Sequence, residues 1–242
     1  MFYVVANARS GTQTIANVLN CAENSAVYHE AEAYPWLELE KDGYSGKLCI
    51  DEVRQFIPPK FVKSAVRDGK IPGDSNHYIS PHISAIARVY PDTKFIYLLR
   101  DPADIIRSWM NLVYPMNDDY LDLIYEHHRW RPFRRNVKSR FVRLCMYWKH
   151  TNQRILTSLS DTDYVIVKIE ELESHLCTIW QWLGFNGGYD KALLACKRKM
   201  NTRAPALHPP FPEYNKWNNA QKEDFREIVQ SSPAYFYNNS NS

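Results

Sequence analysis

Short apolar runs alternate with amphipathic stretches along the chain, and this alternation predicts an α/β fold. Continuous apolar runs rich in β-branched and aromatic residues predict buried strands over residues 2–6, near 25–28, 94–99 and 163–168. Apolar residues on one face predict helices over 12–21 and 102–113. We expect further helices over about 138–159 and 174–183 and a helix in the tail. Loops and helices mix over 32–70. We therefore expect three layers: a central, mostly parallel sheet with helices on both faces.

The first strand leads into a turn that suits a phosphate-like group. Arg9-Ser10-Gly11-Thr12 follows the strand, and the next helix begins at Thr12. Gly11 lets the backbone turn tightly, and the first N–H groups of a helix have no intrahelical partner. The helix dipole, the hydroxyls of Ser10, Thr12 and Thr14, and the Arg9 guanidinium all favour an anion. The alternative is that these residues only cap the helix and form the turn.

A second strand-to-helix junction carries an arginine and a hydroxyl. The strand 94–99 ends at Arg100-Asp101-Pro102, and Ser108 lies two turns into the following helix. Arg100 is thus expected at the carboxyl end of a strand, where ligands bind in open α/β sheets. Arg100 and Ser108 would suit a second phosphate. The alternative is a surface pair of Arg100 with Asp101.

Together these stretches resemble the sulfotransferases that use 3′-phosphoadenosine 5′-phosphosulfate (PAPS), which have a P-loop nucleotide-binding type of fold. The family signature [RK]-S-G-T-x-x is matched from Arg9 through Gln13 to Thr14, and R-D-P with a later serine is matched by Arg100 and Ser108. The resemblance implies that the first motif cradles the 5′-phosphosulfate and the second grips the 3′-phosphate. Weaker similarities at 27–30, 164–172, 182–185 and 217–237 extend it over nearly all 242 residues.

The chain departs from the family pattern at two places. Many relatives carry a lysine where this chain reads Gly73-Asp74-Ser75-Asn76-His77-Tyr78. Some relatives also close on the 3′-phosphate with a late R-K-G loop. The nearest segment here is basic but has no glycine, and it contributes Lys197, Arg198 and Arg203 as candidate donor-binding residues.

Sulfuryl transfer to a hydroxyl needs a general base within hydrogen-bond reach. The resemblance implies Glu30, at the end of the second strand, as the first candidate. His29 is the second candidate, since a free imidazole titrates near neutrality, and His77 is the third. Arg9 would stabilise the leaving phosphate. The alternative for Glu30 is a salt-bridged loop carboxylate. No cluster of His, Cys and Asp has metal-ligand spacing, so we expect no metal.

Length and composition suit one domain over residues 1–242, with a frayed tail from about 238. Arginines and aromatics interleave in an insertion at about 114–140, which we interpret as a cap over the cleft; a solvated face or a nucleic-acid patch is the alternative. The five cysteines are scattered, no apolar run approaches the ~20 residues of a membrane span, and no leader precedes the first strand. We therefore expect a cytoplasmic protein that contacts no membrane.

The expected function is sulfuryl transfer from PAPS to a hydroxyl, or an amine, of a small-molecule acceptor, without nucleic acid as partner. Two alternatives remain open. A kinase-like phosphotransferase is disfavoured because no Gly-Lys-[ST] follows the turn, so the phosphate lysine and the magnesium hydroxyl are missing. A non-catalytic nucleotide-binding or RNA-binding module would use the same fold.

Overall fold

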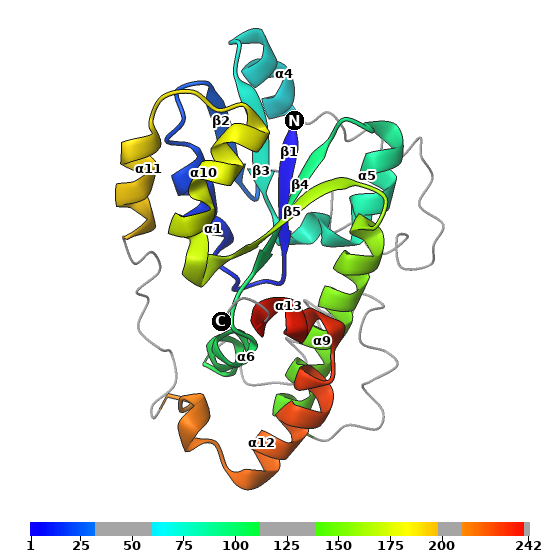
Figure 1. Ribbon diagram of the computed structural model, residues 1–242. Helices are drawn as coiled ribbons and strands as arrows, with labels where there is room; N and C mark the ends of the chain where they lie inside the picture. The colour runs from blue at the N-terminus through cyan, green and yellow to red at the C-terminus, as the bar shows by residue number, and fades with distance from the viewer. Residues whose placement is uncertain (32–59, 112–138, 198–209, 240–242) are drawn as a thin grey trace. The chain divides into compact units, whose positions relative to one another are not determined.

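The structure, a computed structural model, describes residues 1–31, 60–111, 139–197 and 210–239 (Figure 1). It divides the chain into two compact units. The first unit comprises residues 1–99 and 155–202, and the second comprises residues 100–154 and 203–242. The predicted single domain stays a prediction, and the predicted cap at about 114–140 falls almost wholly outside the described residues.

The first unit contains a sheet of five strands, all parallel. Across the sheet the strands run in the order β2 (Ser25–His29), β3 (Ile71–Ser75), β1 (Phe2–Ala6), β4 (Lys94–Leu99) and β5 (Asp163–Lys168). Three of them have the bounds that the apolar runs predict. The predicted parallel sheet is confirmed.

Helices cover the sheet on both faces, because successive side chains of each strand point to opposite sides. In β1, Phe2 and Val4 pack into one core with α1 (Thr12–Leu19), α10 (Leu172–Leu183) and α11 (Tyr189–Cys196). Tyr3 and Val5 pack into a second core with the 3₁₀ turn η1 (His77–His82), α5 (Ile83–Val89) and the last residues of α9 (Arg140–Leu159). This confirms the predicted α/β class.

Strand β3 was not predicted, because its sequence Ile-Pro-Gly-Asp-Ser holds a proline, a glycine and an aspartate, which strands disfavour. Gly73 is required by packing: a Cβ at this position would lie 2.2 Å from Cζ of the Phe2 ring. The strand therefore forms through pairing with β1 and β2, not through local propensity. Helices α5 and α11 were also missed, while α4 (Lys60–Arg67) falls within the region predicted as mixed.

The second unit is helical, with an aromatic core. Its elements are α6 (Pro102–Met110), most of α9, η3 (Tyr214–Lys216), α12 (Asn219–Phe225), the π-helical turn η4 (Arg226–Gln230) and α13 (Pro233–Asn239). The Trp217 ring meets Phe141 edge to face at 4.9 Å, and its Nε1 donates to the Pro212 carbonyl at 2.9 Å. The single tail helix predicted over 217–237 is interrupted before Pro233, which can begin a helix but not continue one.

Three predicted helices have shifted ends, and the one predicted over 102–113 ends at Met110. The helix predicted from 12 to 21 ends at Leu19, and the helix predicted from 174 begins at Leu172. Within the described ranges, no helix is long and apolar enough to cross a membrane.

Gly73→Ala tests the contact between β3 and Phe2. The added methyl group has no space, so the ring or the strand must shift, and we expect a loss of about 1–3 kcal/mol in unfolding free energy by urea titration. Gly69→Asn is the matched control, because Gly69 has open space around it and asparagine tolerates its positive φ. A Gly73→Ala variant as stable as this control would contradict the packing argument.

Candidate functional site

The turn after β1 has the features of an anion site. Arg9 and Gly11 both have left-handed backbone conformations, with φ of 70° and 93°. A Cβ at position 11 would also lie 2.9 Å from Cγ1 of Ile169, so only glycine fits there. Gly11 is the N-cap of α1, and it has no side chain that could accept from the N–H groups of the first turn. The hydroxyl of Ser10 is buried, and no described residue hydrogen-bonds to it. The turn thus presents backbone N–H groups and a hydroxyl that an anion can satisfy.

The N-terminus of α6 in the second unit is built differently. The Asp101 carboxylate accepts from the backbone N–H groups of Ala103 at 2.7 Å and Asp104 at 3.3 Å, so the helix carries its own anion. The Arg100 guanidinium lies 3.5 Å from the Asp104 carboxylate, and Ser108 lies one turn beyond Asp104 on the same helix face. Arg100 and Ser108 belong to the second unit, so their binding of one ligand together with the turn stays a prediction.

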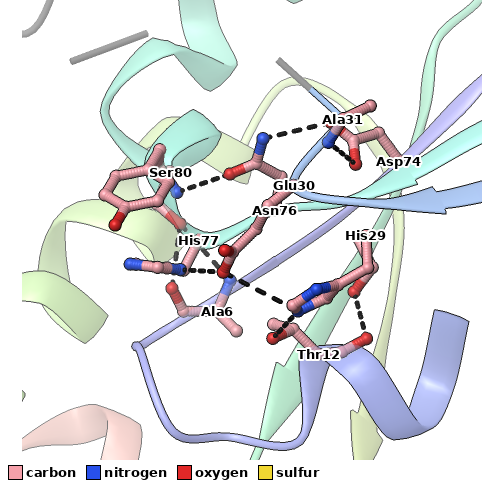
Figure 2. Close-up of polar contacts among 11 residues, drawn as sticks. Ala6, Thr12, His29, Glu30, Ala31, Asp74, Asn76, His77 and Ser80 are labelled. Carbon is pink, nitrogen blue, oxygen red and sulfur yellow. Dashed lines mark hydrogen bonds and ion pairs between the residues drawn. The ribbon is translucent and has the colours of Figure 1, made fainter. Parts of the chain in front are cut away.

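All three candidate bases lie together beside the anion turn in the first unit (Figure 2). Nδ1 of His77 is 3.0 Å from Oε1 of Glu30, and Nε2 of His29 is 3.7 Å from the same oxygen. Nε2 of His29 also lies 3.0 Å from the Thr12 hydroxyl. Thr12 begins α1, so a continuous polar network joins the anion turn to the candidate bases.

Parallel pairing of the strands explains why residues 12, 29, 30 and 77 meet. His29 in β2 is in register with Ser75 in β3, so these strands end at the same edge. The Glu30 N–H then donates to the Ser75 carbonyl at 3.2 Å, with Glu30 in the left-handed region at φ 53°. Of the described non-glycine residues, Arg9 and Glu30 are the two with positive φ. Such strain clusters at functional sites.

The electrostatics of the cluster assign its protons. Burial raises the pKa of Glu30, but the hydrogen bond from His77 and the nearby histidine charges outweigh it and leave that pKa below its usual value. Burial lowers the pKa of His29. An ionised carboxylate only accepts hydrogen bonds, so Nδ1 of His77 must donate. Nε2 of His77 is left as the nitrogen that can accept a proton.

Ser75 lies within the segment 73–78, in which the resemblance led us to expect a lysine. Its side chain is buried, and its hydroxyl donates to the backbone carbonyl of Thr12 at 2.8 Å. The position therefore lies directly against the anion turn, and here it supplies a neutral tie between β3 and α1 instead of a charge.

The sequence reasoning missed Asp74 and Asn76, which are 1% and 0% exposed and adjoin the cluster. Asn76 donates from Nδ2 to the Asp74 carboxylate at 3.1 Å. The signal that could have found them is a run of polar residues directly after a short apolar segment, but Pro72 and Gly73 make that segment look like a loop.

The remaining candidate residues are only partly described. Gln13 is exposed and Thr14 half-buried on the first turn of α1. Lys197 follows α11 and forms an exposed ion pair with Glu173 at 3.5 Å, whereas Arg198 and Arg203 lie outside the described residues. Within the described ranges, no group of three or more His, Cys, Asp or Glu side chains could hold a metal ion.

Comparison with known families bears on this geometry. Residues 50–157 match the model of the sulfotransferase family. The match confirms the predicted resemblance. The matched sulfotransferase segment contains β3, His77, Arg100 and Ser108, and it leaves out the anion turn and Glu30. No curated protein gave a significant match to the chain.

Asp74 should make stability depend on pH. Burial raises its pKa to about 6, against the opposing hydrogen bonds from Asn76 and Ala31. A carboxyl group whose folded-state pKa is raised contributes stability that is complete below about pH 4 and lost as pH rises through about 6.

Asp74→Asn cannot ionise. The unfolding free energy of Asp74→Asn should therefore rise by about 2 kcal/mol relative to that of the wild type between pH 4 and pH 7. Urea titrations of both proteins at the two pH values measure this gain. A difference between the proteins that is equal at both pH values would contradict a raised pKa.

Proposed function

We propose that this protein transfers a sulfuryl group from PAPS to a hydroxyl, or an amine, of a small-molecule acceptor. The observation that carries the proposal is the 3.0 Å contact between Thr12 and His29, which joins an uncapped anion turn to a Glu30–His77 pair at one edge of the sheet. A sulfotransferase needs an anion site and a base in contact. The family match over residues 50–157 supports the same reaction class.

The turn fits the phosphosulfate end of the donor. The buried Ser10 hydroxyl lacks a described partner, and the space at Gly11 admits no side chain. Arg9, Ser10 and the N–H groups from Gly11 to Thr14 would hold this end, while Arg100 and Ser108 would hold the 3′-phosphate. PAPS supplies the sulfuryl group, and adenosine 3′,5′-bisphosphate is the product that leaves. Arg9 would stabilise the negative charge that develops on that product.

The geometry of the Glu30–His77 pair favours His77 over Glu30 as the general base, a choice that the sequence left open. Glu30 is a weak base because its pKa is lowered, with the bond from His77 outweighing the effect of burial. We assign the proton of the acceptor to Nε2 of His77 and the orientation of the imidazole to Glu30. A carboxylate in this role holds the correct tautomer and stabilises the imidazolium. We assign His29 a binding role, as the hydrogen-bond partner of the Thr12 hydroxyl.

The alternatives explain less of this arrangement. A non-catalytic nucleotide-binding module needs the anion turn but has no use for an oriented carboxylate–imidazole pair. A kinase-like transferase would need a metal site and a phosphate lysine, and the turn has no such lysine.

Binding of adenosine 3′,5′-bisphosphate tests the donor assignment. The chain should bind it at least about tenfold more tightly than adenosine 5′-monophosphate, since a charge-assisted contact is worth about 1.5–3 kcal/mol. Calorimetry measures both affinities. Arg100→Ala should remove most of this difference while changing the affinity for the monophosphate little. Equal affinities of the wild-type protein for the two nucleotides would exclude a second phosphate site.

Single substitutions in the pair test the base assignment. His77→Ala should lower kcat by about 10²–10⁴, and added imidazole should restore part of the rate. Binding of adenosine 3′,5′-bisphosphate should survive, because His77 is not assigned to the donor. Glu30→Gln should also lower kcat, because its amide can donate to Nδ1 and favour the wrong tautomer. If His77→Ala kept near-wild-type kcat while Glu30→Gln lost it, the proton would belong to Glu30.

A further inference from the structure

A buried carboxylate without a role in the proposed reaction adjoins the Glu30–His77 pair. Asp74 in β3 is 1% exposed, and its two oxygens accept hydrogen bonds from two different donors (Figure 2). Oδ1 accepts from the backbone N–H of Ala31 at 3.4 Å. Oδ2 accepts from Nδ2 of Asn76 at 3.1 Å. The bond from Ala31 involves the residue next to Glu30, and the bond from Asn76 involves the residue next to His77.

The first bond fixes the backbone that carries Glu30. Glu30 is in the left-handed region, which is unfavourable for a residue with a Cβ and persists only where neighbouring contacts enforce it. The N–H of Glu30 donates to the Ser75 carbonyl, and the next N–H along the chain, that of Ala31, donates to Asp74. Bonds on both sides of the Glu30 Cα therefore tie its turn to β3.

The second bond fixes the start of the turn that carries His77. The Asn76 side chain is fully buried, and its Oδ1 accepts from the backbone N–H of Tyr78 at 3.0 Å, which caps η1. Because Asp74 accepts from Nδ2, the amide of Asn76 can present only its oxygen to Tyr78. His77 lies between these two residues, so its backbone is set by the same contacts.

We infer that Asp74 is a positioning residue, which aligns Glu30 with His77 through Ala31 on one side and Asn76 on the other. Its catalytic consequence rests on the proposed function. The arrangement requires two acceptor oxygens facing two N–H donors, which a carboxylate offers and an amide or an apolar side chain does not. Burial raises the pKa of Asp74 only to about 6, so the carboxylate form is present at pH 7.

A polarity swap tests this inference. Asp74→Asn keeps the shape of the side chain but turns an NH₂ group toward Nδ2 of Asn76, so one of the two bonds is lost. Adding Asn76→Asp restores it in reverse, with the new amide at position 74 donating to the new carboxylate at position 76. That carboxylate can still accept from the N–H of Tyr78. Ser25→Ala is the control for stability loss alone, because Ser25 is buried at the other end of β2, where its hydroxyl donates to Leu19 and Ala22.

The first readout is turnover with PAPS and a hydroxyl acceptor. We expect Asp74→Asn to lower kcat by about 10²-fold, the cost of a small misalignment at a reacting centre, with affinity for adenosine 3′,5′-bisphosphate unchanged. The double variant should recover most of kcat, and Ser25→Ala should keep it. Wild-type kcat in Asp74→Asn, or no recovery in the double variant, would overturn the inference.

The second readout does not depend on activity, so it separates this inference from the proposed function. Long-range ¹H–¹⁵N spectra at alkaline pH report which nitrogen of His77 carries the proton. We expect the Nδ1–H form in wild type, a mixture of both forms in Asp74→Asn, and the Nδ1–H form again in the double variant. If the wild-type protein turns over no acceptor, this pattern still supports the alignment, and an unchanged tautomer in Asp74→Asn overturns it.

Discussion

The parallel pairing of β1, β3 and β2 is the constraint on which the site depends. Val4 and His29 are both in register with Ser75, so β2 and β3 reach their carboxyl ends at the same level of the sheet and β1 ends two residues further on, at Ala6. In a parallel sheet, all chain segments that leave this edge start close together, whatever their separation in sequence. The anion turn leaves from β1, Glu30 from β2 and His77 from β3. A shift of one residue in either pairing would move the polar side chains to the other face.

Short-range polar contacts then fix the positions of the turns that leave this edge of the sheet. The Ser75 hydroxyl holds the Thr12 carbonyl at 2.8 Å, and the Ser75 carbonyl accepts from the Glu30 N–H at 3.2 Å. One residue of β3 thus contacts both the anion turn and the turn that carries the carboxylate. Arg9 and Glu30 have the strained backbones at these two turns. Such backbone strain persists only where the surrounding contacts enforce it.

The parts of this arrangement that the sequence predicts are those encoded locally. The apolar runs of β1, β4 and β5 and the Arg9–Thr14 motif are each contained in one short segment, and the strand bounds agree with the structure. β3 was not predicted, because Pro72 and Gly73 disfavour strands. Pairing with β1 and packing against Phe2 compensate for this low strand propensity. Without β3, Glu30 and His77 could be predicted as separate candidate bases. Their hydrogen bond, and the position of Asp74 beside both, could not be predicted.

An ionised carboxylate beside an anion-binding turn is electrostatically unfavourable in the ground state, and the pairing with His77 offers a physical reason for it. With Glu30 ionised and the imidazole of His77 neutral, the Glu30–His77 pair carries one negative charge; burial raises the pKa of Glu30, but the hydrogen bond from His77 outweighs it and leaves that pKa lowered. In the proposed reaction, Nε2 of His77 would take the proton of the acceptor, and the pair would become neutral overall. This happens as negative charge develops on the leaving phosphate beside Arg9, so the charge near the turn changes little along the reaction. Repulsion is then greatest before the transition state and relieved within it, which is the condition for an electrostatic contribution to rate.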